Sequence, residues 1–174
     1  MTDHTLVLGG ARSGKSRRAI VRAESYNVHP VYIATAEPLD DEMEERIAAH
    51  REERGEHWCT LEVPLLLSSA LREQAKLGRV CVVDCLTIWL SNLMHYEKDP
   101  DEATHELCTT LAELGAPIIL VSNEVGLGIV PESPLGRRFR DAQGRLNQRL
   151  AACCAQVEFM VAGLPMTLKG EPQI

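Results

Sequence analysis

The residues of this chain with the clearest chemical potential form a glycine-rich segment near its start, "GGARSGKS". Its spacing matches the phosphate-binding motif G-x-x-x-x-G-K-[ST], and it follows an apolar run and precedes an amphipathic stretch, as this motif requires. Glycines let backbone N–H groups turn toward phosphate oxygens, and the N-terminus of a following helix adds partial positive charge. We therefore expect a nucleoside triphosphate here, with Lys15 at its β- and γ-phosphates and the Ser16 hydroxyl as a ligand of Mg²⁺. The candidate nucleotide-binding residues of this loop are Gly9, Gly10, Ala11, Arg12, Ser13, Gly14, Lys15 and Ser16.

A second candidate is Asp84, which follows four apolar residues in "VCVVDC". We expect a buried strand to end at this carboxylate, where it would hold Mg²⁺ through water. The alternative is a helix N-cap for the following "LTIWL" segment, and the two roles can coexist.

A third candidate is His50, which lies four residues after Arg46 and four before Arg54. On a helix, side chains at this spacing lie along one face. Guanidinium groups bind phosphate oxygens well, and a neutral imidazole beside a phosphate can attack phosphorus. A solvated histidine on a charged helix is the alternative, and it is our interpretation of His4, His29, His57, His95 and His105.

Apolar runs alternate with amphipathic stretches along the whole chain. We expect strands in residues 5–10, 30–36, 60–64, 79–85, 116–124 and 156–165, and helices in residues 15–26, 39–54, 65–77, 86–97, 101–114 and 135–155. Continuously apolar strands separated by helices predict a parallel sheet that is covered on both faces. The expected fold class is α/β: a single P-loop NTPase domain of RecA-like type, spanning residues 1–174, with a mostly parallel central sheet.

Composition excludes several classes of protein. The net charge of -7 argues against a nucleic-acid partner, which needs a basic surface. The sequence contains no run of about 18 apolar residues, so we expect no membrane span, and "MTDHTLVLGG" lacks the features of a signal peptide. The six cysteines form no C-x-x-C pair. We therefore expect a cytoplasmic protein with reduced, mostly buried cysteines and no structural zinc.

Several segments, taken in order, resemble the bifunctional adenosylcobinamide kinase / adenosylcobinamide-phosphate guanylyltransferase family of cobalamin biosynthesis. They are "LVLGGARSGKS", "VYIATA", "LDDEMEERIAAHREER", "WCTLEVP", "VVDCLTIWLSNLM", "LVSNEVGLGIVPESPLGRRFRDAQGRLNQRLA" and "VAGLP". The resemblance extends from about residue 5 to residue 169. The phosphate loop is generic, whereas "RI-x-x-HR" followed by "W-x-T-x-E", and "SNEVGLGIVP", are far more specific.

The resemblance implies two reactions at one nucleotide site. ATP or GTP phosphorylates the aminopropanol hydroxyl of adenosylcobinamide, a corrinoid. GMP from GTP is then carried on His50, with release of pyrophosphate, and passes to adenosylcobinamide phosphate to give adenosylcobinamide-GDP. The resemblance also suggests a homo-oligomer, specifically a trimer. The nucleotide contacts that it implies are the phosphate loop and Ala34, Thr35, Ala36, Arg51, Glu52, Glu53, Arg54, Glu62 and Asp84.

Several interpretations stay open at the level of sequence. The "ATA" segment could simply end a strand, and Glu62 could be a surface acid or an acceptor for guanine or ribose. The loop "SNEVGLGIVPESP" could lie near the corrinoid or at a subunit contact. The arginines that follow this loop are either a solvated helix face or phosphate ligands; they are Arg137, Arg138, Arg140, Arg145 and Arg149.

Three features depart from the family pattern: Ala49 stands where some members have a second histidine, Leu8 stands where threonine is common, and the tail "KGEPQI" is slightly long. These departures leave the relative strength of the kinase half open. One competing hypothesis is a simple P-loop kinase of a small alcohol without a covalent nucleotide intermediate. The other is a nucleotide-binding regulatory module without a small-molecule substrate.

Overall fold

The structure, a computed structural model, describes residues 3–26, 29–37, 55 and 57–171. The described strands are β1 (Thr5–Gly9), β2 (Val31–Ala34), β3 (Cys59–Glu62), β4 (Cys81–Asp84), β5 (Ile118–Asn123), β6 (Gln156–Val161) and β7 (Leu164–Lys169). The described helices are α1 (Lys15–Glu24), α3 (Leu67–Lys76), α4 (Leu86–His95), α5 (Pro100–Glu113) and α6 (Pro134–Cys153). Each lies in a segment for which the sequence predicted that type of element, except for β7.

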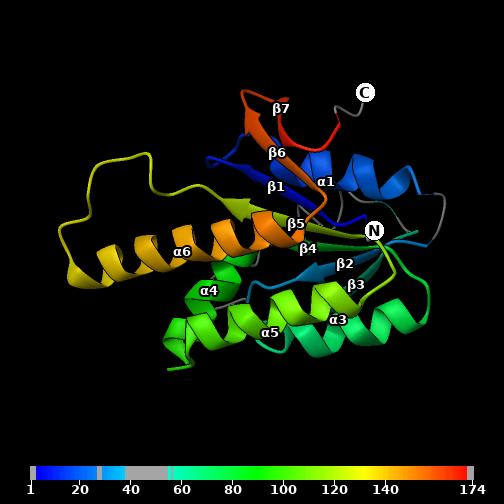
Figure 1. The fold of residues 1–174 in the computed structure, drawn as a ribbon, viewed down its shortest axis with the longest axis horizontal. Coiled ribbons are helices and arrows are strands. Elements are labelled where there is room, and N and C mark those ends of the chain that lie inside the picture. Colours follow the sequence, from blue (N-terminus) through cyan, green and yellow to red (C-terminus); the bar gives the residue numbers. More distant parts are fainter. Residues whose placement is uncertain (1–2, 27–28, 38–54, 56, 172–174) are drawn as a thin grey trace.

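The strands form one sheet in the order β3-β2-β4-β5-β1-β6-β7 (Figure 1). Neighbours from β3 to β6 are parallel, and β7 runs antiparallel to β6. The prediction of an α/β fold with a mostly parallel sheet is therefore confirmed. In a parallel sheet every carboxyl end lies at the same edge, so β1, β2, β4 and β5 bring the residues that follow them together.

The two faces of the sheet have separate apolar cores. Helix α1 packs on one face of the sheet (Figure 1). On that face Val7, Val82 and Val121 belong to a single buried cluster. Helices α3 to α6 pack on the other face. The apolar cluster there is larger and includes Leu120 and Trp89. Side chains of successive residues in a strand point to opposite faces of the sheet. The face of each strand residue at the carboxyl edge therefore follows from its position relative to these core residues.

The C-terminal part of the sheet corrects one prediction. The sequence predicted a single strand over residues 156–165 followed by a tail, but β6 ends at Val161, which pairs with Leu164 at the start of β7. The two residues between them, Ala162 and Gly163, both have positive φ (52° and 82°), as a tight hairpin turn requires. This turn interrupts a continuously apolar stretch, so hydrophobic periodicity could not locate it.

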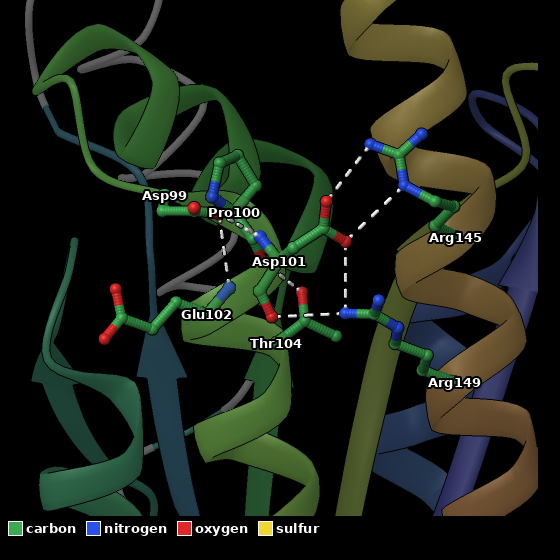
Figure 2. Close-up of polar contacts among 7 residues, drawn as sticks. All are labelled: Asp99, Pro100, Asp101, Glu102, Thr104, Arg145 and Arg149. Atoms are coloured by element: carbon green, nitrogen blue, oxygen red, sulfur yellow. Dashed lines mark hydrogen bonds and ion pairs between the residues drawn. The ribbon is translucent and has the colours of Figure 1, made fainter.

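Helix α5 begins with a complete capping arrangement and is tied to α6 (Figure 2). The Asp99 carboxylate accepts hydrogen bonds from the backbone N–H groups of Asp101 (2.8 Å) and Glu102 (3.2 Å), with proline at the first helical position. Figure 2 shows Arg145 and Arg149 of α6 reaching the Asp101 carboxylate, at 3.4 and 3.1 Å. These two arginines thus belong to a half-exposed, acid-paired helix face, one of the two interpretations that the sequence allowed.

The histidines and cysteines behave mostly as expected. His29, His57, His95 and His105 are exposed, but His4 is fully buried and its Nε2 lies 2.8 Å from the Leu111 carbonyl oxygen. The prediction of a solvated His4 was wrong because β1 is a central strand, covered from its first residues. All six cysteines are free, as expected, but only Cys81, Cys85 and Cys154 are buried, whereas Cys108 and Cys153 are half-buried and Cys59 is exposed. None of the described helices combines the length and apolar character needed to cross a bilayer.

Candidate active site

The phosphate loop connects the carboxyl end of β1 to the start of α1. Gly14 caps the helix in a left-handed conformation (φ 95°), a backbone state that favours glycine. Gly9 also has positive φ (153°), and a Cβ atom there would lie 2.7 Å from both the Met160 carbonyl oxygen and Ser13 Oγ. The Gly163 N–H donates to the Ser13 carbonyl oxygen at 3.1 Å. The loop is therefore packed against the β6–β7 hairpin, a contact that the motif did not reveal.

Two side chains of the loop suit a bound polyanion. The Lys15 side chain is 7% exposed, and its Nζ donates to the Gly10 carbonyl oxygen at 2.5 Å. Burial lowers the pKa of Lys15, while the nearby Cys85 and Asp84 side chains act in the opposite direction. Ser13 Oγ is buried and has no hydrogen-bond partner within the part of the chain that the structure describes. A buried cation next to an unsatisfied hydroxyl group fits phosphate oxygens.

Asp84 is the last residue of β4, as the sequence predicted, and it lies at the same edge of the sheet as the phosphate loop. Its Oδ2 accepts a hydrogen bond from the Tyr32 hydroxyl at 2.8 Å. The N-cap of α4 is Cys85, and no side chain caps that helix, so Asp84 does not have the capping role. The Tyr32 contact was missed, although a tyrosine in a buried strand needs a polar partner and its hydroxyl could have signalled one.

Thr35 fixes the end of β2 to the turn after β4. Its Oγ1 donates to the Cys85 carbonyl oxygen (2.7 Å) and accepts from the Cys85 N–H (2.9 Å), and Asn92 Nδ2 donates to the Thr35 carbonyl oxygen (2.8 Å). Thr35 is fully buried, so its hydroxyl group positions the backbone of the site from inside the protein. Glu62 is exposed at the end of β3, where it and Asp84 both pair in register with Ala34.

The remaining candidate residues lie outside the described part of the chain. They are His50, Arg46 and the segment Arg51, Glu52, Glu53 and Arg54. After β2 the described chain continues to Glu37, at the edge of the sheet that carries Asp84, where the Tyr96 hydroxyl donates to the Glu37 carboxylate (3.2 Å). Beyond the segment that contains His50, Trp58 Nε1 donates to the Glu24 carboxylate (3.4 Å) at the C-terminal end of α1, the end away from the phosphate loop.

The donor atoms at this edge fit a hard cation. Asp84 offers a half-buried carboxylate, and Ser16, the second residue of α1, offers a hydroxyl group. Oxygen ligands of this kind, completed by water and phosphate, suit Mg²⁺. Within the described residues no group of three or more His, Cys, Asp or Glu side chains could form a metal cage of its own.

Strand, glycine loop, helix and an acid at the end of a nearby strand together define a P-loop nucleotide-binding protein. Solved structures agree with this fold class. One of them, an ATPase domain, aligns with a TM-score of 0.51 at 15% identity, covering 90% of this chain and 68% of that chain. The flagellar accessory protein FlaH from Methanocaldococcus jannaschii aligns with a TM-score of 0.55 at 13% identity, covering 98% and 82%. At such identities these similarities show the fold alone.

Sequence comparison identifies the family. The family described as cobinamide kinase / cobinamide phosphate guanyltransferase matches residues 5–168, and the chain belongs to it. It is 53% identical over 170 residues to the bifunctional adenosylcobalamin biosynthesis protein CobP of Pseudomonas aeruginosa, covering 96% of this chain and 98% of that protein. It is 41% identical to the bifunctional protein CobU of Escherichia coli and 38% identical to that of Salmonella typhimurium, covering 94% of this chain and 98% of each relative.

Proposed function

We propose that this protein phosphorylates adenosylcobinamide with ATP or GTP and then transfers GMP from GTP to adenosylcobinamide phosphate through a covalent guanylyl group on His50. The observation that carries the proposal is family membership across residues 5–168. The packed phosphate loop with Asp84 at the same edge supplies the nucleotide site that both reactions need.

In the kinase step, the substrate hydroxyl oxygen forms a bond to the γ-phosphorus, the bond from that phosphorus to the β,γ-bridging oxygen breaks, and a nucleoside diphosphate leaves. Backbone N–H groups at the start of α1 and the buried Lys15 ammonium stabilise the charge on the phosphoryl oxygens. Asp84 and Ser16 would hold Mg²⁺, which supplies further neutralisation of phosphate charge when bound. Tyr32 orients the Asp84 carboxylate by its hydrogen bond.

In the guanylyl step, a neutral His50 nitrogen forms a bond to the α-phosphorus of GTP and the bond to the α,β-bridging oxygen breaks. Pyrophosphate leaves, and the imidazole loses its other ring proton to solvent. A phosphate oxygen of adenosylcobinamide phosphate then attacks the same phosphorus, the N–P bond breaks, and the leaving imidazole takes up a proton from solvent, which restores neutral His50. Two displacements allow donor and acceptor to bind in turn. The arginines at positions 46 and 54 support this role because their spacing from His50 suits one helix face.

The direct test is product analysis. The protein is incubated with adenosylcobinamide, ATP, GTP and Mg²⁺, and the corrinoids are separated and weighed by mass spectrometry. The proposal expects adenosylcobinamide phosphate when ATP alone is present and adenosylcobinamide-GDP when GTP is added. Phosphorylation without any GDP conjugate would favour the alternative, a simple P-loop kinase without a covalent nucleotide intermediate.

The proposal also includes the cellular location and the oligomeric state of the enzyme. We expect a cytoplasmic enzyme, since all six cysteines are free. We also expect a homo-oligomer, because apolar residues of the loop after β5 are strongly exposed; Leu127 is 83% and Ile129 98% exposed. That the oligomer is a trimer is suggested by the family resemblance alone.

A further inference from the structure

The end of β5 carries a polar side chain, that of Asn123, to which the proposed two-step reaction assigns no role. Asn123 is the last residue of β5, which lies between β4 and β1, and it pairs in register with Gly9 of the phosphate loop. On the other side of β5, Val121 pairs with Asp84. Asn123 therefore stands two residues beyond the level of Asp84, directly beside the start of the phosphate loop.

Strand alternation places the Asn123 carboxamide on the nucleotide face of the sheet. Ile119 and Val121 belong to the cluster under α1, so Asn123 shares their face, which is also the face of Val82 and Asp84 on β4. The Asn123 side chain is half-buried, and its carboxamide makes no hydrogen bond to any residue that the structure describes. Its two N–H donors are thus available on the face that carries Lys15.

The backbone of Asn123 is held from two helices by buried polar side chains. Thr87 Oγ1 accepts from the Asn123 N–H (2.8 Å), and Asn147 Nδ2 donates to the Asn123 carbonyl oxygen (3.1 Å). Asn147 Oδ1 in turn accepts from Ser122 Oγ (2.7 Å) and Gln143 Nε2 (3.1 Å). Gln143 and Ser122 are fully buried.

Such a network is costly to bury, and apolar side chains would fill the same space between β5 and α6. The hydrogen bonds of this network fix the backbone of Asn123 at the end of β5. A backbone held in this way restricts where the attached carboxamide can point, which is what a group that must meet a bound phosphate requires.

We propose that the Asn123 carboxamide donates a hydrogen bond to the terminal phosphate of the nucleoside triphosphate, and that Thr87, Gln143 and Asn147 are positioning residues for it. The inference rests on the proposed function. Lys15 would meet the phosphates from the loop after β1, and Mg²⁺, if held by Asp84, would neutralise phosphate charge from the end of β4. Because β5 lies between β1 and β4, a hydrogen-bond donor at its end would point toward the terminal phosphate.

The two half-reactions should respond differently to loss of this contact. In the kinase step the γ-phosphoryl group is the one transferred, so a donor placed on its oxygens contributes to kcat. In the guanylyl step the bond that breaks is between the α- and β-phosphates, and the γ-phosphate stays in the leaving pyrophosphate. There the same contact acts mainly on GTP binding, and so on KM.

The test compares Asn123→Ala and Asn123→Asp with wild type in the full chain. Kinase kcat and KM are measured with adenosylcobinamide and ATP, and the rate of covalent guanylylation is measured at saturating GTP. We expect Asn123→Ala to lower kinase kcat by about 10–100-fold and to change saturated guanylylation by less than about 3-fold. Asn123→Asp should lower kinase kcat further, because a carboxylate repels phosphate. Gln148→Ala, an exposed change on α6, is the control and should leave both rates unchanged.

A wild-type kinase kcat in Asn123→Ala, or an equal fall of both half-reactions, would overturn the inference while leaving the proposed function intact. If wild type itself neither phosphorylates adenosylcobinamide nor forms an adduct, the proposed function fails and takes the inference with it. The positioning role is tested by Thr87→Val against Thr104→Val, since Thr104 is also buried but its hydroxyl donates to the Pro100 carbonyl oxygen of its own helix. Thr87→Val should lower kinase kcat by about 3–10-fold without affecting KM for ATP, and Thr104→Val should not; equal kcat values for the two variants would refute the positioning role.

Discussion

Replacing Thr35 by valine should destabilise the protein far more than the loss of one oxygen atom would normally do. Valine has nearly the same shape, but it removes the acceptor of the Cys85 N–H (2.9 Å) and a donor to the Cys85 carbonyl oxygen (2.7 Å). The carbonyl oxygen keeps its bond from the Trp89 N–H, whereas the buried N–H is left without a partner. An orphaned buried N–H costs about 1–3 kcal/mol and a lost hydrogen bond about 0.5–1.5 kcal/mol, so the free energy of unfolding should fall by roughly 1.5–4.5 kcal/mol.

The assay is urea denaturation of wild type, Thr35→Val and the control Thr110→Val, with thermal melting alongside. For a chain of this size the expected fall in Tm is on the order of 10 °C. Thr110 is as fully buried as Thr35, but its hydroxyl bonds to the Glu106 carbonyl oxygen, which the helix already satisfies. Its valine variant should therefore lose no more than about 1.5 kcal/mol. If the two variants were equally stable, the account of Thr35 as the tie between β2 and the turn after β4 would be refuted.

Three further predictions concern the phosphate loop and the core. Lys15→Met should lower both kinase turnover and covalent guanylylation at least about 100-fold in parallel rate assays, because one ammonium group serves both reactions; a loss in only one would contradict a shared site. Gly9→Ala should weaken nucleotide binding in a calorimetric titration, since its Cβ would lie 2.7 Å from the Met160 carbonyl oxygen, and unchanged affinity would show that the loop tolerates the clash. Burial lowers the pKa of His4 below its usual 6.5, so its neutral form stabilises the fold fully above pH 6.5 and that contribution is lost as the pH falls further. Unfolding free energy should therefore decline below pH 6.5 in wild type and less steeply in His4→Gln; identical pH profiles would exclude His4 as the source.

The parts of the site that sequence could predict are those in which the chemistry is local. The phosphate loop needs eight consecutive residues between a strand and a helix, and Asp84 needs only a strand that ends there, so spacing was sufficient to find both. Helix boundaries were also predicted within a few residues from the amphipathic pattern. The signals that set them in the structure, such as Asp99 followed by proline, act over a single turn and are therefore local in the sequence.

The parts that sequence could not supply depend on which strands are neighbours. Tyr32 meets Asp84 and Thr35 meets Cys85 across about 50 residues of chain, and neither pair has a signature until β2 is known to lie beside β4. The same holds for Asn123, whose significance comes from the position of β5 between the phosphate loop and Asp84. In the sequence His4 resembles an ordinary polar residue near a terminus, and nothing local indicates that it is fully buried beside the Leu111 carbonyl oxygen of α5.

The most direct test of the central claim is the intact mass of the protein after incubation with GTP and Mg²⁺, for wild type and His50→Ala. The account predicts that wild type gains the mass of one guanylyl group, that mild acid removes it as expected for a phosphoramidate, and that His50→Ala gains nothing while still binding GTP. A wild-type protein that binds GTP without any gain in mass would contradict the two-step mechanism. A His50→Ala variant that still gains the group would place the nucleophile elsewhere.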